Sequence, residues 1–208
     1  MNRARQHSEA RLGERRRRLA HEAARLMAEG GIRDYQQAKR KAASRLGVHD
    51  EASLPRNQEI DEALREYQRL FLGAAHADAL RGRREAAARA MEFFAAFQPR
   101  LAGPVLDGTA DAHAPVTLHL HADDPDAVTR FLDEHGIPAE PRDRRIRLDR
   151  HRELDATIWI FDAEDLDFEL VVLPLAVLRQ APLSPLDDKP MQRASLAQLR
   201  NLLASVGS

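Results

Sequence analysis

The sequence has no cysteine and few aromatic residues, and each shortage excludes a class of protein. Without a thiol, the chain has no disulfides and no thiolate-based metal or redox centre. Aromatic residues make up 5% of the 208 residues, and there is a single Trp. Together with many alanines, leucines and arginines, this composition favours helix-rich segments over an all-β sandwich.

Long apolar runs are also lacking. No uninterrupted apolar stretch approaches the roughly 20 residues of a membrane span, and charges interrupt the stretch where a secretory signal would lie. We therefore expect a cytoplasmic protein with no membrane partner. The sequence also lacks the P-loop, the G-x-G-x-x-G loop, the G-x-S-x-G elbow and the H-E-x-x-H motif, so it gives no support for the enzyme classes that depend on them.

Charge is distributed unevenly along a chain whose formal net charge is -1. Residues 1–100 hold 21 Lys and Arg against 14 Asp and Glu, or +7, whereas residues 101–208 hold 11 against 19, or -8. This asymmetry predicts two subdomains, 1–100 and 101–208, that attract one another. The alternative is that the basic helices bind nucleic acid, but their excess charge is modest for that role.

The first hundred residues show helical spacing of apolar residues in four segments. Asp34 and Gly47 fit the N-cap and the C-cap of the second segment, and Leu70 and Phe71 are expected to be buried by the third. The four helices are predicted at about residues 9–29, 34–46, 57–72 and 75–97. We interpret them as a helical bundle, whose apolar faces would serve equally well for an internal core or for a homo-oligomer.

The second half predicts an α+β arrangement. Residues 116–121 alternate apolar and polar side chains, which is typical of a strand with one polar face. A helix is predicted to follow an Asp cap at 123 or 124 and to end at Gly136. Residues 156–161 and 166–173 predict a hairpin, and Ser195 with Gln198 predicts a capping box before the last helix.

The stretch "GPVLDGTA", which begins at Gly103, precedes the predicted strand that starts at Val116. Together with the hairpin, this order resembles the nucleotidyltransferase superfamily with the DNA polymerase β-like core, from about Leu101 to Pro174. In that family a glycine-containing loop and helix N–H groups bind the phosphates of a nucleoside triphosphate. Three carboxylates, two of them in an Asp-x-Asp motif, hold two divalent metal ions.

The family's metal motif is degenerate in this chain. Gly103 matches the family's glycine, but Pro104 stands where a phosphate-binding serine is usual. The Ser-Asp-x-Asp motif falls on residues 114–117, "APVT", so both of its carboxylates are absent. The third carboxylate has two candidates, Glu169 and Asp167. The resemblance therefore implies an α+β protein, a helical bundle followed by a nucleotidyltransferase-like mixed sheet with flanking helices, that has lost standard two-metal catalysis.

The resemblance and the residue pattern together name the candidate site. Glu169 and Asp167 are the catalytic candidates, Gly103, Gly108, Thr109 and Thr117 the phosphate-binding candidates, and His119, His121 and Glu169 the metal candidates. Mg²⁺ or another divalent metal is implied if the protein is active. The alternative for the two histidines is an exposed strand face on which they are solvated or pair with nearby acids.

Two function hypotheses follow. The first is a nucleotide-binding or interaction module without two-metal catalysis, and the alternative is an active transferase that moves a nucleotidyl group from an NTP to an unknown acceptor. An arginine-rich run at residues 142–152 would either bind phosphates or form a charged edge strand, and we favour the edge strand. Arg179 and Arg193 are expected to reach the acidic hairpin in a structural role.

Overall fold

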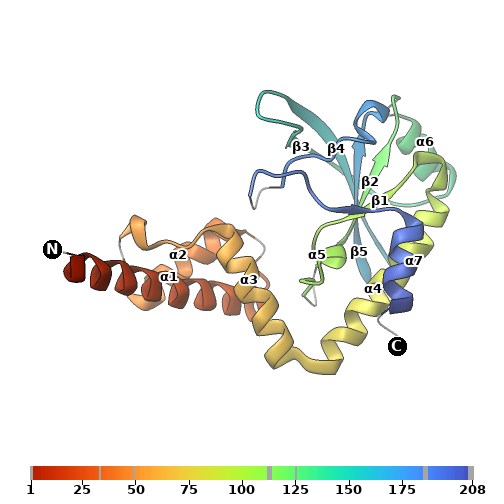
Figure 1. Cartoon of the computed structure of the whole chain (residues 1–208). Coiled ribbons are helices and arrows are strands. Elements are labelled where there is room, and N and C mark those ends of the chain that lie inside the picture. Colours follow the sequence, from red (N-terminus) through yellow and green to blue (C-terminus); the bar gives the residue numbers. More distant parts are fainter. Residues whose placement is uncertain are drawn as a thin grey trace. The chain divides into compact units, whose positions relative to one another are not determined.

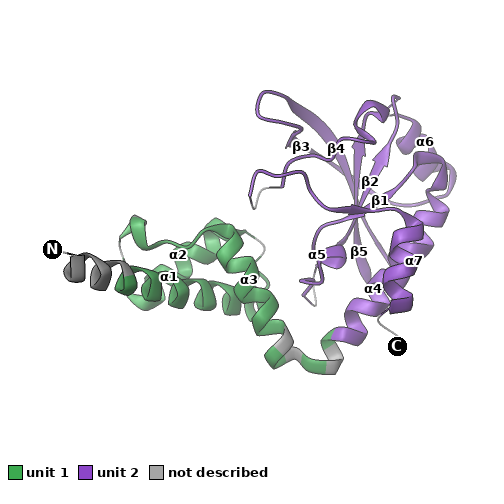
Figure 2. Cartoon of the chain, in the orientation of Figure 1, with its two compact units in different colours: residues 1–76 green, residues 77–208 purple. Residues whose placement is uncertain are grey.

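The chain forms an α+β structure of N-terminal helices followed by a mixed sheet, as the sequence predicts (Figure 1). The computed structural model describes residues 2–32, 34–48, 50–111, 114–124, 126–184 and 187–205. Internal contacts divide the chain into unit 1, residues 1–76, and unit 2, residues 77–208 (Figure 2). This division falls in a helix, whereas the change of pattern in the sequence lies at about residue 100.

Unit 1 consists of three helices around a small apolar core. Helix α1 spans Asn2–Gly30, α2 spans Tyr35–Leu46 and α3 spans Asn57–Tyr67, with a 3-10 turn, η1, at Glu51–Ser53. Alanine is the commonest residue of this core, and a small side chain lets helices approach closely. The predicted caps of α2 are confirmed: the Asp34 side chain accepts a hydrogen bond from the Gln37 amide at 2.9 Å, and Gly47 is left-handed.

A π-helical segment, η2 at Gln68–Leu72, lies between α3 and the next helix, α4, at Gly73–Phe93. The prediction that Leu70 and Phe71 are buried is wrong, because 61% and 68% of their surfaces are exposed. A π turn holds more residues than an α turn, so it rotates the following side chains away from the stripe that the α-helical period predicts. The expected bundle of four helices is also wrong, since the buried residues of α4 from Ala86 onward belong to the core of unit 2.

Unit 2 contains a six-stranded sheet in the order β3-β4-β5-β2-β1-β6. Strands β2 and β5 are parallel, and every other neighbouring pair is antiparallel. The strands span Arg100–Ala102 (β1), Val116–His121 (β2), Glu140–Arg147 (β3), Glu153–Ala163 (β4), Leu166–Leu173 (β5) and Arg193–Ala194 (β6). The predicted hairpin is confirmed as β4 and β5, which join through Glu164 and Asp165, both at positive φ as a type I′ turn requires.

Helices cover one face of this sheet. They are α4, α6 (Asp126–Glu134) and α7 (Leu196–Ser205) (Figure 1). The predicted ends of α6 and α7 are confirmed, since Gly136 is left-handed and Ser195 and Gln198 form the reciprocal bonds of a capping box. We call this face the apolar face, because β2 and β5 direct Val116, Leu118, Leu120, Phe168 and Leu170 into the core beneath it.

The opposite face, which we call the polar face, carries the other side chains of β2: Thr117, His119 and His121. Paired residues of neighbouring strands point to the same side, so this face also holds Arg100 beside His119 and Glu169 beside Thr117. A smaller apolar cluster occupies part of it, formed by Leu148, Ala156, Ile158, Val171, Leu173 and Val177. The segment after β5, which begins with the 3-10 turn η4 (Leu175–Val177), contributes to this cluster.

Candidate functional site

The structure brings together three of the predicted site residues: Gly103, Thr117 and Glu169. Gly103 follows β1 with φ 72° and ψ -160°, a conformation that side chains strongly disfavour. A Cβ on Gly103 would lie 3.7 Å from Oγ1 of Thr117. Thr117 in turn is the register partner of Glu169 on the parallel strand β5. Three segments far apart in sequence therefore meet at one point of the polar face.

An arginine forms an ion pair with the Glu169 carboxylate. Nη1 of Arg144, from edge strand β3, lies 2.5 Å from Oε1 of Glu169. The Glu169 side chain is only 12% exposed, whereas Arg144 is 56% exposed, so the guanidinium closes the carboxylate off from one side. The contact is an ion pair without hydrogen-bond geometry, since Oε1 of Glu169 has no hydrogen-bond partner among the described residues. The nearby guanidinium still offsets the charge that would otherwise attract a divalent cation.

Gly108 and Thr109 have a different environment from Gly103. They follow α5, a single turn at Pro104–Asp107, and Gly108 ends it with φ 82° and a bond from its N–H to the Pro104 carbonyl. Arg84 of α4 binds the same turn, donating to the carbonyls of Val105 and Leu106 at 3.0 and 3.1 Å. A Cβ on Gly108 would lie 3.7 Å from Nη2 of Arg84. The geometry thus gives Gly108 a role in holding α5 against α4.

Asp167 lies at the outer end of β5, opposite Asp162 of β4. The two side chains interact, and a hydrogen bond between them raises the pKa of Asp162, followed in size by desolvation and by the charge of Asp167. Both residues are exposed. The strand faces agree with the prediction that Asp167 and Glu169 share a side of the sheet, but Asp167 belongs to a carboxyl pair at the hairpin end.

His119 and His121 are buried rather than solvated, with 3% and 2% of their surfaces exposed. Desolvation, with the nearby charge of Arg193 next in size, lowers the pKa of His119 to about 3. Desolvation also dominates in lowering the pKa of His121 to about 4. Both imidazoles are therefore neutral at physiological pH. The expectation of a solvated histidine face is wrong, because Arg193 and the chain after β5 lie over it.

No group of three or more His, Asp or Glu side chains that would hold a metal ion occurs within the described ranges. His121 illustrates why: its Nδ1 lies 3.0 Å from the Gln98 carbonyl and its Nε2 lies 3.3 Å from Nη1 of Arg193. A carbonyl accepts, so Nδ1 carries the hydrogen and Nε2 accepts from the arginine. Both ring nitrogens of His121 are thus occupied.

The arginine-rich run forms an edge strand, as favoured from the sequence. β3 stands at one end of the sheet, and most of its side chains are exposed. Arg145 pairs with Asp155 at 3.3 Å and Arg147 with Asp188 at 2.6 Å. The expectation that Arg193 reaches the acidic hairpin is wrong, because its guanidinium contacts His121 and the carbonyls of Val177 and Leu178.

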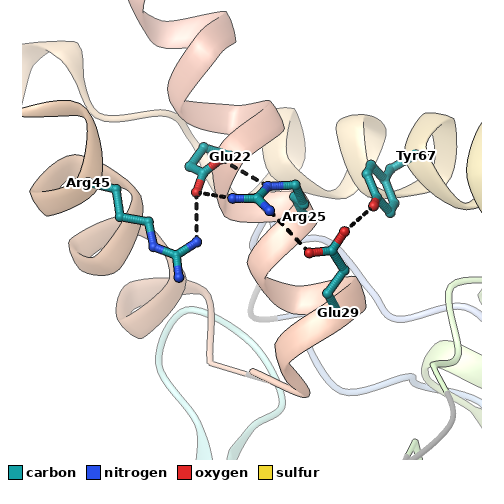
Figure 3. A network of polar contacts seen from close by, with 5 residues as sticks. All are labelled: Glu22, Arg25, Glu29, Arg45 and Tyr67. Atoms are coloured by element: carbon teal, nitrogen blue, oxygen red, sulfur yellow. Dashed lines mark hydrogen bonds and ion pairs between the residues drawn. The ribbon is translucent and has the colours of Figure 1, made fainter.

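Unit 1 holds a polar network of its own (Figure 3). Glu22 of α1 accepts from Arg25 at 2.9 Å and from Arg45 of α2 at 3.1 Å, while Tyr67 of α3 donates to Glu29. The bond from Arg25 is the largest cause that lowers the pKa of Glu22. These contacts tie the three helices together at their surface, which is a structural role. Nucleic-acid binding by the basic helices stays a prediction.

Comparison of the chain with protein-family models, with curated proteins and with solved structures gave no match. Across the described part of the chain, no helix combines the length and the apolar character needed to cross a membrane. The interpretation of the candidate site therefore rests on its geometry alone.

Sequence reasoning did not identify the arginines of the polar face as site residues. Arg144 was one of six in a run, and Arg100 and Arg193 lie nearly a hundred residues apart. The pairing of β1 with β6 places Arg100 and Arg193 on neighbouring strands, and no local sequence pattern predicts this pairing. The available signal was weak: Arg100 occupies the start of a short strand that leads into Gly103.

Proposed function

We propose that unit 2 binds the phosphate groups of a nucleotide on the polar face of its sheet and does not transfer a nucleotidyl group by the two-metal mechanism. Three features support binding: a glycine in a conformation that only glycine readily adopts, the neighbouring Thr117 hydroxyl and an exposed arginine lie around one point. They provide close backbone approach, a hydroxyl donor and a positive charge, which are the groups that recognise phosphate.

The observation that carries the second half of the proposal is the ion pair between Arg144 and Glu169. The two-metal mechanism needs several carboxylates around the ions. Glu169 is the carboxylate in register with Thr117, and its partner is a guanidinium at 2.5 Å. We infer that Arg144 provides the positive charge that a metal ion provides in an active transferase, so nucleotide binding does not require a divalent metal.

The test is calorimetric titration of the full chain with ATP, GTP, CTP and UTP, first with EDTA and then with Mg²⁺ or Mn²⁺. We expect one or more nucleotides to bind in EDTA. Glu169→Gln should tighten this binding by about threefold or more, because it removes a repulsive carboxylate and releases Arg144. Arg144→Ala should weaken it by about tenfold.

Arg142→Ala is the matched control. Arg142 belongs to the same edge strand and is exposed, and its nearest acid is Glu140 at 3.8 Å. It should change nucleotide affinity by less than about twofold. Binding that appears only with Mg²⁺ or Mn²⁺ and disappears in Glu169→Gln would instead support the active transferase. Absence of heat at millimolar nucleotide under all conditions would overturn nucleotide binding and leave an interaction module.

A further inference from the structure

Among the described residues, Arg193 is a partly buried cation that has no ion-pair partner. Its Nη1 lies 3.3 Å from Nε2 of His121, and its Nη2 donates to the Leu178 carbonyl at 3.1 Å, with longer contacts of 3.5 Å to the Val177 carbonyl. All of these partners are neutral. Desolvation lowers the pKa of Arg193, and the charge of Arg100 lowers it further. A guanidinium in this environment is usually stabilised by an anion.

Arg100 adds a second positive charge near Arg193 and does not compensate the first. Its Nη1 donates to the carbonyl of the preceding residue, Pro99, at 3.0 Å. Within the part of the chain that the structure describes, no carboxylate forms an ion pair with Arg100 or Arg193. Strand β1 separates β2 from β6, so the register places both arginines on the polar face, at the His119 and Ala102 positions.

The Glu169 carboxylate, which lies on the same face, does not compensate the two arginines. Glu169 is in register with Thr117, and its ion-pair partner is Arg144. The cluster formed by Arg100, Arg193, His119 and His121, which we call the arginine–histidine cluster, therefore carries two positive charges from its arginines. The histidines lie beneath them and stay neutral, so they neither add to the charge nor cancel it.

His119 adds an independent observation. The side chain is 3% exposed, and its buried Nδ1 has no hydrogen-bond partner among the residues that the structure describes. A buried polar atom in this state costs free energy unless a ligand or water completes it. The charge of Arg193 acts directly on the pKa of His119, so the orphaned nitrogen belongs to the same cluster as the uncompensated charge.

We propose that the arginine–histidine cluster is a binding site for a phosphate or pyrophosphate group, held mainly by the guanidinium groups of Arg100 and Arg193. Two guanidinium groups present planar sets of N–H donors that suit a doubly charged oxyanion, whereas a single carboxylate would neutralise only one of them. The site goes beyond the proposed nucleotide binding, since it recognises the anion alone and needs no base, no ribose and no Glu169.

The experiment titrates the full chain with inorganic phosphate, pyrophosphate and acetate in EDTA, with calorimetry and thermal unfolding as readouts. Pyrophosphate should bind more tightly than phosphate and should raise the melting temperature, while acetate at the same concentration should have little effect. Arg100→Gln should weaken pyrophosphate by about tenfold, with Arg142→Gln on the edge strand as the control for loss of one positive charge.

Arg193→Gln is the second variant, but Arg193 also binds the chain after β5, so its folding must be confirmed by circular dichroism. Arg100→Gln keeps the test valid even if that variant does not fold, because the hydrogen bond of Arg100 in the described part of the chain goes to the carbonyl of its neighbour, Pro99. A site-specific readout comes from ¹⁵N-histidine NMR, in which pyrophosphate should shift the ring signals of His119 and His121. Equal weakening by Arg100→Gln and Arg142→Gln, unmoved ring signals, or no binding would overturn the proposal.

The two proposals fail separately. Pyrophosphate binding that depends on Arg100, with no nucleotide binding, supports the anion site and removes the proposed function. Nucleotide binding that depends on Arg144 and is unaffected by Arg100→Gln supports the proposed function and removes the anion site.

Discussion

The two faces of the sheet in unit 2 are formed by the same strands but differ in the kinds of side chain that they bury. On the apolar face, β2 and β5 pack against α4, α6 and α7, and the core there consists of aliphatic and aromatic side chains. On the polar face, the alternate residues of the same strands include two buried histidines and a glutamate, and arginines of β1, β3 and β6 lie beside them. The first face holds the larger apolar core, whereas the second combines a smaller apolar cluster with buried polar groups that cost stability unless they are satisfied.

The largest expected effect comes from the apolar face. Phe94 is 1% exposed, and its ring lies 5.5 Å from that of Phe131 on α6. Phe94→Ala should lower the free energy of unfolding by roughly 3–5 kcal/mol, because it creates a cavity in a packed core. Urea denaturation measures the change. Phe93→Ala is the control, since Phe93 is 44% exposed and should cost clearly less. Equal losses would show that the core is not where we describe it.

The second prediction concerns the polar face and pH. The pKa values of His119 and His121 fall to about 3 and about 4 on folding, so between these values and about 6.5 the unfolded chain binds more protons than the folded one. Stability should therefore fall as pH decreases below about 6.5, by up to about 1.4 kcal/mol per pH unit for each histidine.

His119→Leu should flatten this pH dependence and leave the contribution of His121. Urea denaturation at several pH values between about 7 and about 5 measures the slope. His151→Leu on the surface controls for loss of an imidazole. A slope in His119→Leu that equals that of the unsubstituted protein would contradict the buried, neutral state of His119.

The third prediction uses two glycines of unit 2. Gly103→Ala should lower the free energy of unfolding by roughly 1–3 kcal/mol, because φ 72° with ψ -160° is strained for any side chain. Gly82 lies inside α4 with open space around its Cα, so Gly82→Ala should raise it by about 0.5–1 kcal/mol. Thermal and urea unfolding should both show that Gly103→Ala destabilises the protein and that Gly82→Ala stabilises it. A stabilising Gly103→Ala would contradict the backbone conformation described for Gly103.

The smallest effects separate two ion pairs. Arg144→Ala leaves Glu169, which is 12% exposed, without its partner, and we expect a loss of about 1–2 kcal/mol. Arg89 pairs with Glu164 at the hairpin turn, and both are well exposed, so Arg89→Ala should have no measurable effect. Comparing the two variants in urea tests whether the polar-face pair is special. Similar losses would indicate that it is an ordinary surface contact.

Local signals in the sequence predicted the local structure well. Asp34, Gly47, Gly136 and Ser195 mark helix ends in the sequence and in the structure, because capping depends on a few neighbouring residues. The β4–β5 hairpin was predicted equally well. The packing of α4 against the sheet was not predicted, since an amphipathic helix does not reveal whether its partner is another helix or a sheet.

The candidate site was predictable in part. Gly103, Thr117 and Glu169 were named from the sequence, and the structure places them together. The burial of His119 was not predictable, because alternation in β2 reports which face a residue takes but not what covers that face. The pairing of Arg144 with Glu169 depends on the order of β3, β4 and β5, which no local pattern encodes.

The order of the strands has a consequence for synthesis on the ribosome. Central strand β2 is made well before its parallel neighbour β5, and β1 receives its second neighbour only when β6 is made, at residues 193–194. The helices of unit 1 need no later partner to close their core. A growing chain therefore presents a folded N-terminal unit followed by an incomplete sheet with apolar strand residues, and that interval is when unit 2 is most open to aggregation and to chaperones.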